Sequence, residues 1–130
     1  MEHDNLFIQI LEILSIKYTE DFTIRFYESH PHKNNLFGLS EMLRYYNIEN
    51  VAAEIQKTQE NLSSLDVPFV AYVDHEFVLV RHVSTEAIIY SWRGKNITLS
   101  IPAFLERWSG IVLLFESTDE SINRIIKNIE

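Results

Sequence analysis

The hydrophobic pattern changes its period near residue 48, and this change limits the available folds more than any other feature. Before it, apolar residues recur at helical spacing; after it, short β-rich runs alternate with turns. Helices followed by strands, rather than strands alternating with helices, are typical of α+β proteins with an antiparallel sheet. The 130 residues suffice for one domain with a single core and are too few for two.

The first part predicts three helices, which we place at residues 6–16, 22–28 and 36–45. Asp4 or Asn5 is positioned to cap the first helix, whose apolar face is so wide that we expect it to be buried. Pro31 closes the second helix, and Asn47 provides a left-handed stop after the third. Tyr45 and Tyr46 are interpreted as core or core-edge residues.

The second part predicts an antiparallel sheet with short helical insertions. Arg93-Gly94-Lys95-Asn96 is a hairpin signal between two of the strands. Pro102 is tolerated in the first turn of a short helix. The expected strands are 48–56, 67–73, 76–83, 87–92, 97–101 and 111–115, with helical segments at 58–62 and 103–108.

Charge and composition exclude several kinds of function. The chain has 11 Lys and Arg against 19 Asp and Glu, a formal net charge of −8, which argues against a nucleic-acid partner. The absence of cysteine excludes disulfides, thiolate metal sites and a cysteine nucleophile. The longest unbroken apolar run, 111–115, is far shorter than a spanning helix, and the acidic N-terminus is unlike an export signal. We therefore expect a cytoplasmic protein, or the soluble domain of an inner-membrane protein.

The histidines do not assemble a site by spacing. His30-Pro31-His32 lacks a third metal ligand and is interpreted as a surface turn, so we expect no metal and no cofactor. His75 and His82 lie in or beside a predicted strand next to carboxylates, but neighbouring strand residues point to opposite faces. The remaining histidine is His3.

The order and the amino-acid sequences of several segments resemble those of the C39 peptidase-like domain, the papain-like module at the N-terminus of bacteriocin and toxin exporters. The closing segment, Phe104 to Leu114, is the most specific match. The resemblance covers roughly residues 5–116. The other matching segments are Leu11 to Leu14 with Tyr18, Gly38 to Tyr45, Val67 to Phe69, and Phe77 to Val80 with Val83.

The resemblance implies that every catalytic position is replaced. The family's peptidases use a cysteine at the start of the first helix, a histidine on a strand and an aspartate one strand later. In this sequence the cysteine position falls at Leu6, the histidine position at Glu76, because Phe77 fixes the register, and the aspartate position near Trp92. The family's oxyanion glutamine falls at or before residue 1. His75 is offset by one residue, which turns a strand side chain to the other face.

We therefore expect a papain-like, non-catalytic C39 peptidase-like domain that binds or docks a peptide or protein segment. Its groove is expected around Leu6, Glu76, Tyr90 and Trp92. The larger protein containing this domain would be a membrane exporter or a vitamin K epoxide reductase-like oxidoreductase. The sequence of residues 30–40 suggests the latter. The alternatives are a hydrolase with a rearranged site around His75, His82 and Glu76, and a free-standing cytoplasmic scaffold.

The last segment is set apart from the domain, which we place at residues 1–116. Ser117 to Glu120 has capping-box spacing, and isoleucines follow at helical spacing at 122, 125, 126 and 129. We expect residues 117–130 to form an amphipathic helix or linker toward a following segment, with an apolar stripe that is docked or makes a homodimer.

This expectation predicts a difference between the full chain and a version ending at Glu116. An isolated helix of about a dozen residues is marginal in water, and burying each isoleucine is worth roughly 1.5–3 kcal/mol at most. We expect size measurements or amide exchange to show the segment docked or self-associated. Two monomeric proteins, with residues 117–130 exchanging as fast as free peptide, would contradict it.

Overall fold

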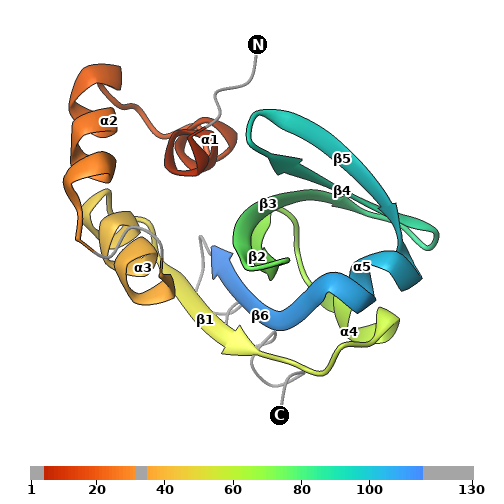
Figure 1. Cartoon of the computed structure of the whole chain (residues 1–130). Coiled ribbons are helices and arrows are strands. Elements are labelled where there is room, and N and C mark those ends of the chain that lie inside the picture. The colour runs from red at the N-terminus through yellow and green to blue at the C-terminus, as the bar shows by residue number, and fades with distance from the viewer. Residues whose placement is uncertain (1–4, 32–34, 116–130) are drawn as a thin grey trace.

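The computed structural model describes residues 5–31 and 35–115, so the segment 117–130 lies outside the described residues. Within them, three helices come first and an antiparallel sheet with two inserted helices follows (Figure 1). The helices are α1 (Leu6–Ile13), α2 (Glu20–Ser29), α3 (Leu36–Tyr45), α4 (Gln59–Ser64) and α5 (Ile101–Arg107). The strands are β1 (Asn50–Glu54), β2 (Phe69–Val73), β3 (Glu76–Val83), β4 (Ala87–Trp92), β5 (Lys95–Ser100) and β6 (Trp108–Phe115).

The six strands form one sheet in the order β1-β6-β2-β3-β4-β5, and every neighbouring pair is antiparallel. Strands β2 to β5 follow one another as a meander, whereas β6 returns to insert between β1 and β2. The α+β prediction is confirmed.

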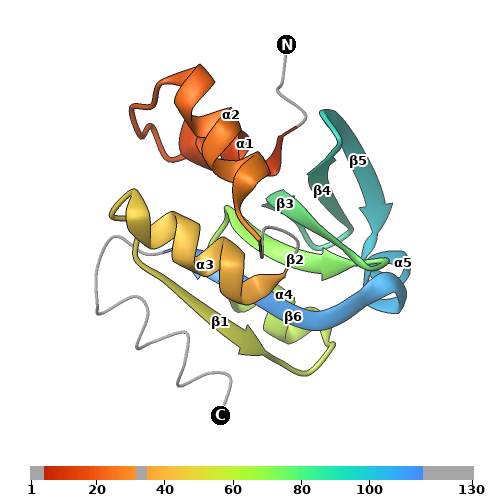
Figure 2. The same cartoon turned by 60° about the vertical axis from the view of Figure 1, so that its left-hand side comes forward.

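The sheet is covered on both faces because apolar residues occupy both sets of alternating positions. In β2, Val70 faces the cluster built with α1 and α3, while Phe69 and Ala71 face the cluster with α4 and α5. The pictures show the first three helices gathered on one side of the sheet and the two short ones on the other (Figures 1 and 2).

Helix α1 is the most deeply buried helix, as its wide apolar face predicted. The Asn5 carboxamide oxygen accepts hydrogen bonds from the N–H groups of Phe7 and Ile8 at 2.8 and 3.2 Å, which caps the helix. Every side chain from Phe7 to Leu11 is buried. The capped start of α1 therefore has a fixed position, and Leu6 is its first residue.

The boundaries near the C-terminal end differ from the prediction. The Ser100 hydroxyl accepts from the Ala103 N–H at 3.3 Å, so α5 begins at Ile101 and ends at Arg107 instead of running over 103–108. Strand β6 then begins at Trp108 rather than at Ile111. Strand β2 begins at Phe69 instead of Val67, since Pro68 has no N–H to donate to a strand ladder.

Gly110 allows β6 to continue through a position where the sequence predicted a break. Its φ is +91°, and a Cβ built there would lie 2.7 Å from the carbonyl oxygen of Ile55. The Ile55 N–H in turn donates to the Gly110 carbonyl at 2.9 Å. A close backbone contact, rather than a helix end, explains this glycine.

We predict that Gly110→Ala destabilises the domain by about 1–3 kcal/mol, because the methyl group meets a backbone oxygen and the left-handed conformation is disfavoured. Denaturant unfolding measures this loss. Gly94→Ala is the matched control, since Gly94 also has positive φ, +79°, but lies in a hairpin turn. Equal losses in the two variants would show that the contact with Ile55 is unimportant.

Candidate functional site

Two hairpin turns set the geometry at one end of the sheet. Asp74 and His75 join β2 to β3 with φ of 50° and 67°, and Arg93 and Gly94 join β4 to β5 with φ of 49° and 79°. Two successive left-handed residues are typical of the tight turns that match strand twist. Leu79 pairs with Ser91, so the start of β3 lies beside the end of β4.

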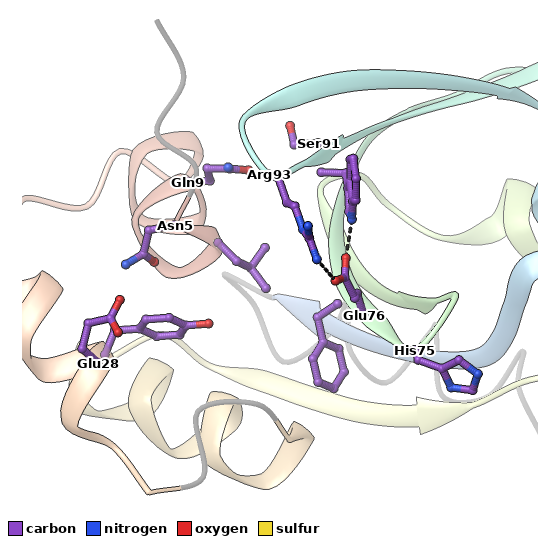
Figure 3. A pocket seen from close by; sticks show the side chains of 11 residues that line it. Asn5, Gln9, Glu28, His75, Glu76, Ser91 and Arg93 are labelled. Atoms are coloured by element: carbon purple, nitrogen blue, oxygen red, sulfur yellow. Dashed lines mark hydrogen bonds and ion pairs between the residues drawn. The ribbon is translucent and has the colours of Figure 1, made fainter.

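Glu76 and Trp92 meet at this end. The Trp92 indole Nε1–H donates to Glu76 Oε2, and Arg93 Nη2 donates to Glu76 Oε1 at 2.5 Å. The Arg93 guanidinium carbon also lies 4.8 Å from the Trp92 ring centroid, within cation–π range. Figure 3 shows Arg93 reaching the Glu76 carboxylate, with dashed lines marking the hydrogen bonds that this carboxylate accepts. The two positions identified by family resemblance are therefore bonded to each other and to a third residue.

The hydrogen bond from Trp92, followed by the one from Arg93, holds the pKa of Glu76 below its ordinary value; partial desolvation acts weakly in the opposite direction. The carboxylate is therefore ionised at neutral pH. The lowered pKa makes Glu76 a weaker base than an ordinary carboxylate. Each of its oxygen atoms already accepts a hydrogen bond, one from Trp92 and one from Arg93.

A pocket of about 500 Å³ lies between the start of α1, the start of β3 and the end of β4. Leu6 lines it from the helix, and Glu76 and Trp92 line it from the sheet, so the structure brings these three predicted positions together. The complete lining is Asn5, Leu6, Gln9, Tyr27, Glu28, His75, Glu76, Phe77, Ser91, Trp92 and Arg93.

Several lining residues were not predicted. Gln9 is 3% exposed and lies on the same helix face as Leu6, three residues earlier. Its polarity among the otherwise apolar residues 6–11 of α1 was the signal that could have identified it. Ser91 is also buried, and its hydroxyl accepts from Arg81 Nε at 2.5 Å. Tyr27 and Glu28 reach the pocket from α2, which no local pattern indicates.

Tyr90 does not line this pocket, although it was expected in the groove. It lines a second pocket of about 380 Å³, together with Val78, Ile97 and Arg107. It is 5% exposed, its ring centroid lies 6.1 Å from that of Phe104, and burial raises its pKa. Glu76 and Trp92 line both pockets because they lie at the end of the sheet, between its two faces.

The histidines of the alternative hydrolase site are not brought together. His75 lines the pocket, but its ring points away from the Glu76 carboxylate (Figure 3). His82 is exposed and lies six residues along β3, roughly 20 Å from Glu76. His30 is instead 3.7 Å from Glu41, and His3 and His32 lie outside the described residues.

Residues 5–31 and 35–115 contain no group of three or more His, Asp or Glu side chains arranged to hold a metal ion. None of their helices has the length and apolar character needed to cross a membrane.

Helices packed on this antiparallel sheet, with a pocket where the first helix meets the sheet, define a papain-like domain. The sequence profile of the Peptidase C39 family matches residues 9–120. The chain therefore belongs to the C39 peptidase family. No match was found among curated proteins.

Solved structures share the fold at low sequence identity. A double-glycine-motif protease from an AMS/PCAT transporter, in complex with its leader peptide, has a TM-score of 0.74 and 15% identity over 87% of this chain and 81% of that one. The peptidase domain of Streptococcus ComA, a bi-functional ABC transporter, has a TM-score of 0.71 and 13% identity over 88% and 90%. The N-terminal C39-like domain of a Vibrio parahaemolyticus toxin secretion ATP-binding protein has a TM-score of 0.68 and 14% identity over 91% and 99%.

We predict that the Trp92 indole N–H resonance reports the titration of Glu76. Because the pKa is lowered from 4.5, the stabilisation from this carboxylate is complete above about pH 4.5 and is lost as pH falls through the lower value. NMR should show a shift with a midpoint below 4.5 that is absent in Glu76→Gln. An indole signal that titrates identically in both proteins would contradict the assignment.

Proposed function

We propose that this domain binds a peptide segment of a transported or partner protein without cleaving it. One observation carries the proposal: Leu6, Glu76 and Trp92, to which the family resemblance assigns the nucleophile, base and orienting positions, line one pocket. A pocket lies where the family's peptidases would have their active site, but its side chains are suited to binding a ligand rather than to cleaving one.

The chemistry at each position supports binding over catalysis. Leu6 has no nucleophilic atom, although it occupies the first turn of α1, where a helix dipole favours an anionic group. Glu76 is engaged by Trp92 and Arg93. The indole of Trp92 is a donor only and cannot accept a proton at neutral pH.

The lining matches an extended peptide better than a compact polar ligand. Aromatic faces from Tyr27, Phe77 and Trp92 can cover apolar side chains, while Asn5 and Gln9 provide amide groups for peptide bonds. The solved protease with TM-score 0.74 was crystallised with a leader peptide, which supports a peptide as the ligand class.

We propose an ABC exporter as the parent. The matched structures include domains of ABC transporters, and none of those named above points to a vitamin K epoxide reductase-like protein. The domain would then act on the cytoplasmic side of an inner membrane, with its ligand segment being part of the cargo.

We predict that the protein does not cleave a synthetic peptide carrying a double-glycine leader, and that Leu6→Cys alone does not create cleavage. The introduced thiol would face a carboxylate instead of a histidine, and a nearby anion disfavours thiolate formation. Mass spectrometry of the peptide after long incubation measures this. Turnover by the unmodified protein that is lost on His75→Ala or His82→Ala would favour the hydrolase.

We predict that Trp92→Ala weakens binding of the double-glycine leader peptide at least tenfold, as measured by fluorescence anisotropy with a fluorescein label on the peptide. The substitution removes the one tryptophan side chain among the pocket-lining residues, which is a hydrogen-bond partner of Glu76. Phe37→Ala is the matched control, since Phe37 is an aromatic residue outside the pocket and is 70% exposed. Equal weakening by both substitutions, or by neither, would exclude the pocket as the binding site.

A further inference from the structure

An exposed aromatic surface lies on α2 and α3, away from the pocket. Phe22 and Tyr45 are 43% and 62% exposed, and their ring centroids lie 6.4 Å apart. The half-buried Phe26 contacts both, with its ring centroid 5.9 Å from Phe22 and 4.7 Å from Tyr45. We call these three residues the aromatic face; none of them lines the pocket. Tyr45 was expected in the core or at its edge, and its exposure corrects that expectation.

The aromatic face continues along α3. Phe37 precedes Tyr45 by eight residues, a little over two helical turns, and is 70% exposed. Three of the four exposed large apolar side chains in the described residues thus belong to α2 and α3; the fourth, Val67, precedes β2. Adjacent exposed aromatic rings mark an interaction surface more often than single exposed apolar residues do.

The described chain leaves the sheet next to this surface. Phe115, the last residue of β6, pairs with Asn50 at the start of β1. Asn50 follows Tyr45 by five residues, so the two Cα atoms are at most about 18 Å apart, and the paired Phe115 adds about 5 Å. Phe115 and Tyr46 also belong to the same core cluster. Figure 2 shows α3 leading directly into β1.

The segment that follows Phe115 has the length and pattern to cover the aromatic face. Six residues lie between Phe115 and Ile122, and the seven Cα–Cα steps can span up to about 25 Å, which bridges the distance to Tyr45. A helix would spread the isoleucines from 122 to 129 over about 10 Å, and Phe37 and Tyr45 on α3 are about 12 Å apart. Two apolar stripes of similar length are therefore within reach of each other.

We propose that residues 117–130 dock in cis on the aromatic face, antiparallel to α3. Ile122 would lie at Tyr45 and Ile129 would lie toward Phe37, because the chain arrives from the C-terminal end of α3. A short tether gives the segment of the same chain an effective concentration in the millimolar range. The same chain is thus favoured over a second copy as the source of the isoleucine stripe.

Cysteine pairs test this contact, because the chain has no cysteine of its own. The full-length variant Tyr45→Cys with Ile122→Cys should form a disulfide within one chain under mild oxidation, seen as faster migration of a monomer on a non-reducing gel. Tyr45→Cys with Arg124→Cys is the matched control, since in a helix position 124 would lie on the opposite side from the isoleucine stripe. The first pair should close at least tenfold faster.

The outcomes separate the occupants. Disulfide-linked dimers would assign the surface to a second copy, and equal rates for the two pairs would show that the segment does not dock there; either result overturns the proposal. Amide exchange of residues 117–130 provides an independent measurement. Tyr45→Ser with Phe22→Ser should speed this exchange at least tenfold, whereas Val67→Ser should leave it unchanged. Unchanged exchange in the double variant would also overturn the proposal.

Discussion

The packing of α1 against the sheet is the contact on which the other helices and the pocket depend. Phe7 is fully buried, and its ring lies 5.2 Å from Tyr46 in an edge-on contact and 6.1 Å from both Phe26 and Tyr27. Rings from α2 and the end of α3 therefore converge on one side chain of α1. Each such apolar side chain contributes roughly 1.5–3 kcal/mol through burial. Because α1 cannot slide without breaking these contacts, its first residue stays at the pocket.

The helical half of the fold could be predicted because its apolar residues recur at i, i+3 and i+4. The order of strands could not, since β6 inserts between β1 and β2 through contacts distant in sequence. The error near Ile101 arises because the Ser100 cap starts α5 earlier than Pro102 suggested. Gly110 resembled a helix stop, whereas it relieves a backbone contact with Ile55.

The candidate site was predictable only where a register was fixed. Phe77 fixed the register at Glu76, and the family resemblance placed the third position near Trp92. Tyr90 lies on the same strand but lines only the second pocket, whereas Trp92, the last residue of β4, lines both. Tyr27 and Glu28 line the pocket because α2 packs against α1. This helix packing is tertiary structure, so no local sequence pattern predicts it.

Because Trp92 donates a hydrogen bond to Glu76, a substitution at either position changes which residues suit the other. An aspartate at 92 would face the Glu76 carboxylate and set two negative charges together. A histidine at 76 would have to become positively charged beside the Arg93 guanidinium when it accepted a proton. An aspartate at 92 thus creates a repulsion while Glu76 is present, and a histidine at 76 gives up the ion pair with Arg93. The three positions are therefore coupled: the effect of changing one of them depends on the residues at the other two.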